Sequence, residues 1–389
     1  MVNILYFTQL FYPAVFGGGE YIFYNWALEL TRSGHQVFVV TQKLRGENNF
    51  EVLDGISIHR VGLPIDYLGT LPGGICQNAS FLLNSYFKGL EILKKNKIDL
   101  IHSNTYIPVI SANWCAKKKN IPHIITMHDV YHSSDKDFWK NWSKQKGTPF
   151  VTRYIGRWLE KTISQIQANT FHTVSNKSKS DLEQIGVSRP IAIIPNGIRA
   201  DRYKAQGKTE KQIIYVGRLV FYKNLDTLID AFSIVVKKMS NTRLIIVGDG
   251  PMRTHMENKI HDLGLENNVI LKGRVSEEEK IMLIGQSTAL ANPSTVEGFG
   301  IVVLEGFACS KPAIVSDVEP LSDLVIDNED GFVVPAFDAA AWSEKMLYFL
   351  ENEQAAASMG SKGRQKVEEQ YSIEKLSKDL LQLYNSVLR

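Results

Sequence analysis

The chain is 389 residues long, with 44% hydrophobic and 22% charged residues, a composition typical of soluble globular proteins. Because this length exceeds what one ordinary hydrophobic core organises, we expect two domains. The net charge of +3 divides unevenly: residues 1–195 hold 21 basic and 14 acidic side chains (+7), and the rest hold 23 and 27 (−4). This mild basic excess is far below that of a nucleic-acid-binding face, so we expect no nucleic-acid partner.

The ends and the cysteines indicate a cytoplasmic protein. The apolar run at residues 1–7 follows no basic leader and contains Asn3, so we interpret it as a buried strand and not as a signal peptide. No apolar run approaches the roughly 18 residues of a membrane-spanning helix. Cys76, Cys115 and Cys309 are odd in number and widely spaced, which argues against a disulfide framework and a structural zinc site. We therefore expect a reducing compartment and no metal.

Short β-branched or aromatic runs alternate with longer amphipathic stretches, which predicts βαβ units and parallel sheets. A first series of expected strands covers residues 4–8, 37–41, 56–61, 100–103, 123–127, 171–174 and 192–194. After a polar stretch at 199–211, a second series covers residues 212–216, 244–247, 269–271, 289–291, 313–315 and 332–334. The predicted fold is therefore α/β with two Rossmann-like domains, at 1–198 and 199–371, and a last amphipathic helix at about 372–389.

The strongest chemical signal follows the strand expected at 289–291. Open parallel sheets bind ligands at the carboxyl ends of their strands, and here Glu297 precedes a glycine-flanked turn that leads into a helix expected at 301–308, on which Glu305 lies. A carboxylate can accept hydrogen bonds from two adjacent hydroxyls, so one glutamate suits a sugar ring and the other a ribose. The helix's first amides suit a diphosphate; they belong to Phe299, Gly300 and Ile301. The alternative is a capped helix whose glutamates pair elsewhere.

A basic pair follows the strand expected at 212–216. Arg218 comes after Gly217, and Lys223 lies five residues further on. Two cations at this edge can converge on one pyrophosphate and neutralise the charge that grows on a leaving nucleotide. Taken alone, such a pair is more often a solvated surface feature.

These motifs resemble those of the retaining glycosyltransferases of family 4, which have the GT-B architecture of two Rossmann-like domains facing each other across a deep cleft. The resemblance spans nearly the whole chain and implies that Glu297 contacts the donor sugar, that Glu305 contacts the ribose, and that Arg218 and Lys223 stabilise the diphosphate without a metal. Around Lys223, Phe221-Tyr222 and Asn224 depart from the small or acidic residues and the glycine of many relatives.

The resemblance also assigns the remaining turns. Gly248-Asp249-Gly250-Pro251 is a tight turn that admits close backbone approach. Ser276 is expected to cap a helix that starts near Glu277. By resemblance, the nucleotide is bordered by Gly217, Gly250, Arg274 and Val275, the last two at the base, and the last helix crosses back to the N-terminal domain. A plain strand-to-helix connection is the alternative for residues 273–276.

Two sites in the first half complete the prediction. Gly18 and Gly19 open a helix expected at 21–30 with uncovered amides, which favours an anion, and the loop lacks the Gly-x-Gly-x-x-Gly of a dehydrogenase. By resemblance, these glycines lie near the donor phosphates and the acceptor, and His128 contacts the donor sugar. The alternatives are helix–sheet packing for the glycines and a structural role for the histidine.

Residues 135–161 combine seven Lys or Arg residues with six aromatics, including Trp139, Trp142 and Trp158. Such a mixture suits an anionic lipid surface or a polyprenyl-diphosphate acceptor, because the rings can rest at the interface while the charges meet phosphates. An amphipathic helix with core aromatics is the slightly favoured alternative.

The predicted function is transfer of a sugar, with retention, from a UDP- or GDP-sugar to a glycan, a lipid-linked acceptor or a small molecule. No cofactor besides the donor is expected, and the enzyme is placed in the cytoplasm or at the inner face of the membrane. The alternatives are a nucleotide-sugar epimerase, a glycan phosphorylase or a noncatalytic nucleotide-binding scaffold.

Overall fold

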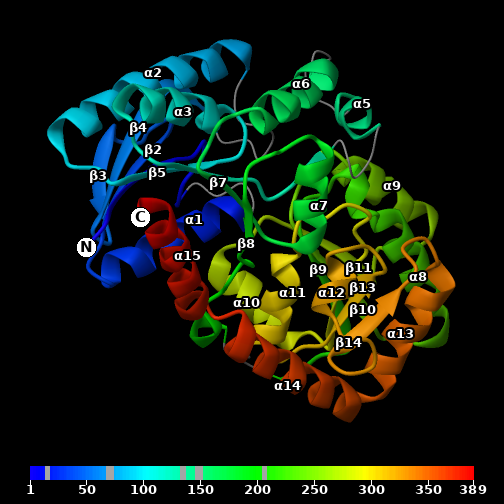
Figure 1. Ribbon diagram of the computed structural model, residues 1–389. Coiled ribbons are helices and arrows are strands. Elements are labelled where there is room, and N and C mark those ends of the chain that lie inside the picture. The colour runs from blue at the N-terminus through cyan, green and yellow to red at the C-terminus, as the bar shows by residue number, and fades with distance from the viewer. Residues whose placement is uncertain (14–17, 67–73, 132–136, 145–151, 204–207) are drawn as a thin grey trace. The chain divides into compact units, whose positions relative to one another are not determined.

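The computed structural model contains two α/β units, each built on its own sheet (Figure 1). Unit 1 comprises Met1–Gly197 and Ile373–Arg389, and unit 2 comprises Ile198–Ser372. The structure describes all residues except 14–17, 67–73, 132–136, 145–151 and 204–207. The predicted α/β class with two Rossmann-like sheets is confirmed.

The sheet of unit 1 has the strand order β3-β4-β2-β1-β5-β6-β7-β8, and every neighbouring pair is parallel except β3–β4. Phe7 of the central strand pairs with Val40 on one side and Ser103 on the other. The strands are β1 (Asn3–Phe7), β2 (Gln36–Leu44), β3 (Phe50–Leu53), β4 (Ile56–Ile65), β5 (Leu100–Asn104), β6 (His123–Thr126), β7 (Thr170–Thr173) and β8 (Ile191–Ile193).

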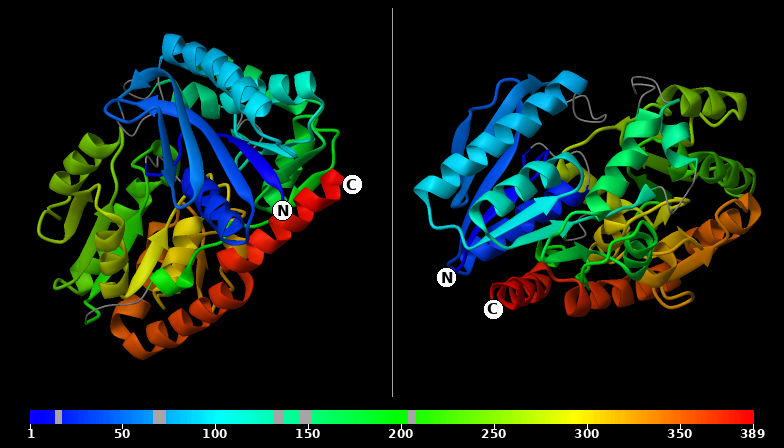
Figure 2. Two further views of the ribbon diagram at one scale, coloured as in Figure 1. Left: turned by 90° about the vertical axis from the view of Figure 1, so that its left-hand side faces the viewer. Right: turned by 45° about the horizontal axis from the view of Figure 1, so that its top comes forward.

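Helices cover both faces of this sheet. Helices α2 and α3 pack together on one face, and α1 packs with α15 on the other (Figures 1 and 2). The C-terminal helix therefore belongs to unit 1. The helices are α1 (Gly18–Arg32), α2 (Ile75–Lys95), α3 (Ile107–Lys119), α5 (Phe138–Trp142), α6 (Thr152–Ser164), α7 (Asn176–Gln184) and α15 (Ile373–Leu388).

Strand β3 was not predicted from the sequence. It is the antiparallel edge strand, with Phe50 and Val52 exposed. Asp54 and Gly55, both with positive φ, connect it to β4. An Asp-Gly pair between two strands is a characteristic hairpin signal, so this element could have been found from its turn and not from its periodicity.

The sheet of unit 2 is entirely parallel, with the order β11-β10-β9-β12-β13-β14. The strands are β9 (Gln212–Val216), β10 (Arg243–Val247), β11 (Val269–Gly273), β12 (Ala289–Asn292), β13 (Ala313–Ser316) and β14 (Gly331–Val334). The helices are α8 (Leu225–Lys238), α9 (Arg253–Asp262), α10 (Glu277–Gln286), α11 (Ile301–Ala308), α12 (Leu321–Leu324), α13 (Ala339–Glu351) and α14 (Glu353–Gln370), with the 3₁₀ turns η1 (Ala200–Arg202) and η2 (Phe221–Lys223).

One apolar core joins the strands and one helical layer of unit 2. It contains β9 and β10 side chains such as Ile213 and Leu244, together with Phe232 of α8 and Trp342 of α13, all fully buried. Because both faces of a parallel sheet are buried, polar groups can reach a ligand only from the loops that follow the strands.

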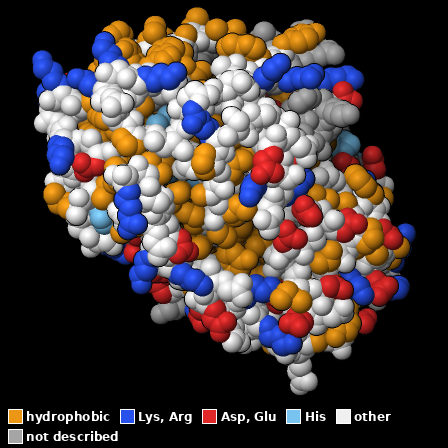
Figure 3. All heavy atoms as spheres, in the orientation of Figure 1, with side chains coloured by type: hydrophobic (Ala, Val, Ile, Leu, Met, Phe, Trp, Pro, Cys, Tyr) orange, Lys and Arg blue, Asp and Glu red, His pale blue; other side chains and the backbone are white. Residues whose placement is uncertain are grey.

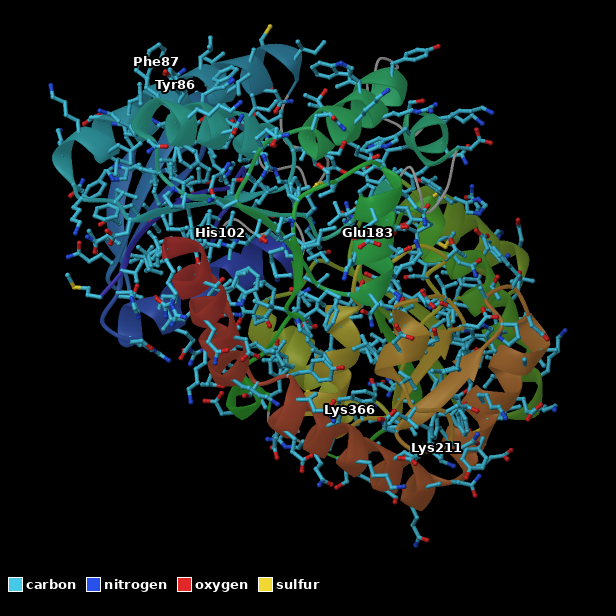
Figure 4. The ribbon with its side chains drawn as sticks, viewed as in Figure 1. Tyr86, Phe87, His102, Glu183, Lys211 and Lys366 are labelled. Atoms are coloured by element: carbon cyan, nitrogen blue, oxygen red, sulfur yellow. The ribbon has the colours of Figure 1, made fainter. Side chains whose placement is uncertain are left out.

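A chain of buried hydrogen bonds crosses unit 1 and includes His102, which Figure 4 shows beside α15. The Tyr384 hydroxyl of α15 bonds the Tyr6 hydroxyl (2.9 Å) and Nδ1 of His102 (2.7 Å). Nε2 of His102 bonds Thr126 Oγ1 (2.6 Å), which bonds Nδ1 of His172 (2.8 Å). These bonds connect α15 through β5 and β6 to β7, so the C-terminal helix is attached to the sheet by polar contacts as well as by packing.

Burial keeps the histidines of this sheet neutral. It lowers the pKa of His123 to about 3 and that of His172 to about 4, and the pKa of His102 lies well below its ordinary value for the same reason, with the neighbouring histidines adding to the effect. A charged imidazole would lose its hydration inside the sheet without gaining a carboxylate partner.

These lowered pKa values predict an acid-sensitive unit 1. As pH falls, the unfolded chain binds protons first, so the stabilisation is complete above about pH 6.5 and is lost as pH falls toward 4 and 3. Each histidine should remove about 2 kcal/mol of unfolding free energy between pH 7 and pH 5. Urea unfolding of His123→Gln should show a shallower pH dependence than wild type. Equal slopes in the two proteins would contradict this account.

Candidate functional site

The candidate site of unit 2 lies where the strand order reverses. From β9 the chain adds β10 and β11 on one side and then returns to place β12 on the other side of β9. The loops that follow β9 and β12 therefore leave toward opposite sides of the sheet, and such switch points are where open α/β sheets bind ligands. The loop after β9 carries Arg218 and Lys223, and the loop after β12 carries Glu297.

The loop after β9 is fixed by internal hydrogen bonds. Nη2 of Arg218 donates to the Tyr222 hydroxyl (2.6 Å), and the Arg218 and Lys223 cations lie 6.0 and 5.5 Å from the centre of the Tyr222 ring. Asn224 takes the left-handed conformation (φ 50°), and its side-chain amide donates to the Ala336 carbonyl oxygen (2.6 Å). Asn224 thus takes a conformation that usually favours glycine, and its side chain attaches the loop to the segment after β14.

The loop after β12 is attached directly to the first loop. Thr295 donates its backbone N–H (2.8 Å) and its hydroxyl (3.1 Å) to the Tyr222 carbonyl oxygen. This contact brings Glu297 beside Lys223, and Lys223 Nζ donates to Glu297 Oε2 at 2.5 Å. Both side chains are largely buried, at 13% and 17% exposure. The structure therefore brings three of the predicted residues together in an ion-paired cluster with a second cation, Arg218, at the same ring.

Helix α11 begins next to this cluster. Gly300 precedes it with φ 93°, and a Cβ there would clash with the Leu321 side chain, so the turn requires glycine. The predicted helix 301–308 is confirmed at those bounds. Its amino end carries the free amides and partial positive charge of a helix start, which are suited to an anion. The predicted residues Phe299, Gly300 and Ile301 lie at this end, with Phe299 packed against the Tyr371 ring.

Glu305 lies on the buried side of α11 in a separate polar cluster. Its Oε1 accepts from Lys280 Nζ (2.7 Å) and from the Tyr203 hydroxyl (3.1 Å). Glu277 joins the cluster, because its carboxylate pairs with the same lysine (2.9 Å) and lies 3.1 Å from the same hydroxyl, whose single proton can be donated to either glutamate. Burial raises the pKa of Glu305, and the ammonium of Lys280 opposes that rise. Lys280 thus favours the ionised, hydrogen-bond-accepting form of a carboxylate that is only 5% exposed.

The glycine turns bring three strand-end loops into backbone contact. A Cβ at Gly248 would overlap the Gly217 carbonyl oxygen, and one at Gly250 would overlap that of Leu219. Gly248 N–H also donates to the Gly273 carbonyl oxygen (2.8 Å). The predicted residues Gly217, Gly250, Arg274 and Val275 therefore lie along the carboxyl edge of β9, β10 and β11. The predicted cap is confirmed, since Ser276 Oγ accepts from Glu279 N–H (3.1 Å).

The predicted residues of unit 1 lie at the carboxyl ends of β1 and β6. Gly18 and Gly19 are the first residues of α1, while Gly17 lies outside the described residues. His128 follows β6, and both of its ring nitrogens are shielded from solvent without a hydrogen-bond partner among the described residues. Burial lowers its pKa to about 3, so the ring is neutral. A structural histidine would bond its neighbours, whereas these nitrogens could serve a ligand.

The aromatic and basic segment 135–161 divides into core and surface. Trp139 and Trp142 of α5 are buried, and Gly156 of α6 leaves room for the Trp139 ring. Trp158 and Tyr154 of α6 are each 61% exposed. The lipid-surface hypothesis is wrong for the first two tryptophans, whose rings fill the core, and residues 135–136 and 145–151 lie outside the described residues.

Three residues of the site were missed by sequence reasoning. Tyr222 organises the cations, while Tyr203 and Lys280 hold Glu305. Lys280 carried a weak signal, since it lies on the first turn of the helix that the predicted Ser276 cap begins. Nothing in the sequence around Tyr203 links it to Glu305, 102 residues away.

Within the described ranges, no three His, Cys, Asp or Glu side chains gather as potential metal ligands. Across the same part of the chain, no helix has the length and apolar character to span a bilayer.

Known proteins share both the sequence pattern and the fold. Residues 16–202 match the family model for glycosyltransferase family 4, and residues 199–366 match that for glycosyl transferases group 1. An uncharacterized glycosyltransferase of Methanocaldococcus jannaschii is 31% identical over 74% of this chain and 75% of its own length.

Solved structures agree with this classification. The sucrose-phosphate synthase of Thermosynechococcus elongatus superposes with a TM-score of 0.82 over 100% of this chain and 99% of its own, at 20% identity. The Anabaena protein HepE in complex with UDP-glucose gives a TM-score of 0.76 over 99% and 100%, at 18% identity. The fold and the strand-end motifs thus define a glycosyltransferase of the GT-B type. Within that class, the chain belongs to glycosyltransferase family 4.

Proposed function

We propose that this protein transfers a hexose from a nucleoside-diphosphate sugar to a hydroxyl acceptor with retention of the anomeric configuration. The observation that carries the proposal is the convergence of Arg218, Lys223 and Glu297 beside the start of α11 at the switch point of unit 2. This combination offers two cations and free amides to a diphosphate and a carboxylate to sugar hydroxyls. HepE, a protein of the same fold, was solved with UDP-glucose, which supports a UDP-sugar, with a GDP-sugar as the alternative.

In the proposed reaction, the bond between the sugar's anomeric carbon and the diphosphate oxygen breaks, and its electron pair stays on the diphosphate. The acceptor oxygen bonds the same carbon on the same face, and its proton passes to the departing phosphate. Arg218 and Lys223 stabilise the developing charge, so the proposal includes no metal ion. Lys223 would exchange Glu297 for phosphate as the donor binds, which frees the Glu297 carboxylate to accept hydrogen bonds from the sugar.

The remaining site residues position the donor. Glu305 accepts hydrogen bonds from the ribose hydroxyls, and the edge formed by Gly217, Gly250, Arg274 and Val275 borders the nucleotide. His128 bonds the donor sugar through one of its unpartnered nitrogens, and Gly18 and Gly19 lie near the donor phosphates and the acceptor. This assignment makes unit 2 the donor-binding domain and unit 1 the acceptor domain. The cysteines are free, which supports a cytoplasmic setting.

The same fold supports other chemistry on nucleotide sugars, so the products decide the reaction class. Incubation with donor alone would release an epimer if the protein were an epimerase, and phosphate-dependent sugar release would indicate a phosphorylase. A scaffold would bind the donor without turnover. The proposal expects a new glycoside only when a hydroxyl acceptor is present.

Loss of the Arg218 charge should remove transition-state stabilisation. We expect Arg218→Ala to lower kcat by roughly 100- to 1000-fold, the effect of removing one preorganised donor to a developing anion. Arg243→Ala is the matched control. Arg243 is the first residue of β10, so it lies at the amino-terminal edge of the sheet, opposite the edge that carries Arg218, and it pairs with Glu210 at the surface. Steady-state kinetics with donor and acceptor would measure both. Near-normal turnover of Arg218→Ala would contradict the assignment.

Lys280 should act on ribose recognition through Glu305. Wild-type protein should bind a nucleoside diphosphate more tightly than its 2′,3′-dideoxy analogue, and Lys280→Met should reduce this ratio several-fold, because an uncompensated Glu305 takes up a proton and accepts hydrogen bonds less well. The ratio should recover as pH rises and in Lys280→Arg. Calorimetric titration measures it. A general loss of structure would weaken both ligands equally and leave the ratio unchanged, which would contradict the role.

A further inference from the structure

The outer face of α2 exposes a ridge of apolar side chains. Ala79, Leu83 and Phe87 follow one another at four-residue spacing and so lie on one side of the helix. Leu83 is 53% and Phe87 65% exposed. The opposite side of α2 already supplies the core, with Phe81 and Ile92 buried, so the exposed ridge is not needed to attach the helix to the sheet.

Helix α3 extends this ridge into a surface. Trp114 of α3 is 40% exposed, and the Tyr86 ring lies between it and Phe87, at centroid distances of 5.7 and 5.4 Å. In Figure 4, Tyr86 and Phe87 extend from the outer side of α2, and Figure 3 shows apolar side chains along this upper edge. We name Leu83, Tyr86, Phe87 and Trp114, with the lysines described next, the α2–α3 surface.

Lysines collect at one end of the α2–α3 surface. Both helices connect parallel strands, so they run in the same direction and their C-terminal ends lie together. Lys94 is two turns beyond Phe87 on the same side of α2, and Lys117 and Lys118 are one turn beyond Trp114 on α3. These three lysines are exposed, and Figure 3 shows basic side chains at this end of the apolar edge.

Acidic side chains are nearly absent from these helices. Glu91 is the one acidic residue in α2 and α3, and it is paired with Lys88 and Lys95 (2.8 Å to the latter). Residues 74–120 hold seven lysines against Glu91 and Asp99, a net charge of +5. An apolar ridge that continues into an excess of positive charge matches an anionic lipid surface. Aromatic rings settle at the boundary of the acyl chains, while lysines extend to the headgroup phosphates.

We propose that the α2–α3 surface docks unit 1 onto an anionic lipid bilayer. The ridge from Leu83 to Trp114 enters the interface, and Lys94, Lys117 and Lys118 contact the headgroups. Helix α6, with exposed Tyr154, Ile155 and Trp158, lies on the same side of unit 1 in Figure 1 and is the competing surface that the test must separate. The docking is independent of the transfer reaction and needs no substrate.

Vesicle flotation tests the proposal with the full-length protein. Wild type should bind vesicles with one-third phosphatidylglycerol, bind phosphatidylcholine vesicles weakly, and release from the anionic vesicles at high salt. The triple variant Leu83→Ser, Phe87→Ser, Trp114→Ser should lose at least tenfold in binding. The comparison variant is the double substitution Tyr154→Ser, Trp158→Ser on α6, which should keep most of the wild-type binding.

A charge series provides the second measurement. Lys94→Gln, Lys117→Gln, Lys118→Gln should weaken binding by roughly fivefold for each lysine removed. Lys237→Gln, Lys238→Gln, Lys272→Gln makes the same change in net charge on unit 2 and should bind like wild type. Because these lysines are exposed, both lysine triples should keep the wild-type melting temperature.

Four results would overturn the proposal. The first three are an absence of binding by wild type, loss of binding in the α6 variant with retention in the α2–α3 variants, and equal weakening by the two lysine triples. Self-association that the serine triple abolishes, seen by sedimentation without vesicle binding, would likewise assign the surface to a second copy of the chain and overturn the lipid proposal.

Discussion

The ion pair between Lys223 and Glu297 is the interaction around which the candidate site is built. The two residues are 74 positions apart, and they meet because β9 and β12 are neighbours in the sheet and the Tyr222 carbonyl accepts both hydrogen bonds of Thr295. With Arg218 at the same tyrosine ring, this cluster carries one net positive charge at the start of a helix. Such a place favours an incoming anion over any neutral ligand.

The second cluster has the opposite balance. Glu305 and Glu277 share one lysine, which gives this cluster an excess of acidic over basic side chains. In the proposed function, the cationic cluster beside the start of α11 attracts the diphosphate, and Glu305, within the helix, accepts hydrogen bonds from the ribose hydroxyls.

The sequence predicted the site residues that directly follow parallel strands, because the carboxyl ends of such strands meet at one edge of the sheet. Arg218, Lys223 and Glu297 were expected at one sheet edge, and the bounds of helix 301–308 and the Ser276 cap were correct because glycine, serine and apolar spacing determine such boundaries locally. The partners of Glu305 could not be predicted from the sequence, since Tyr203 and Lys280 meet the glutamate only through tertiary packing. The edge strand β3 was missed because its two sides are partly exposed, and Trp139 and Trp142 were ambiguous because an amphipathic pattern does not say which face is covered.

Unit 1 has a different character. Its buried polar residues bond one another within the sheet, where Tyr6, Tyr384 and the neutral histidines join α15 to the strands. His128 differs, because neither of its ring nitrogens has a hydrogen-bond partner among the described residues. Its outer helices present apolar and basic side chains instead. These outer side chains form the α2–α3 surface that we propose to dock on a lipid bilayer.

Calorimetric titration of the whole protein with UDP, GDP and the corresponding monophosphates tests the central claim most directly, because we propose that the cluster at Arg218, Lys223 and α11 binds a diphosphate. The account predicts that one diphosphate binds with a stoichiometry of one and at least tenfold more tightly than its monophosphate. Failure of every diphosphate to bind, or equal affinity for the mono- and diphosphate of the same base, would contradict it.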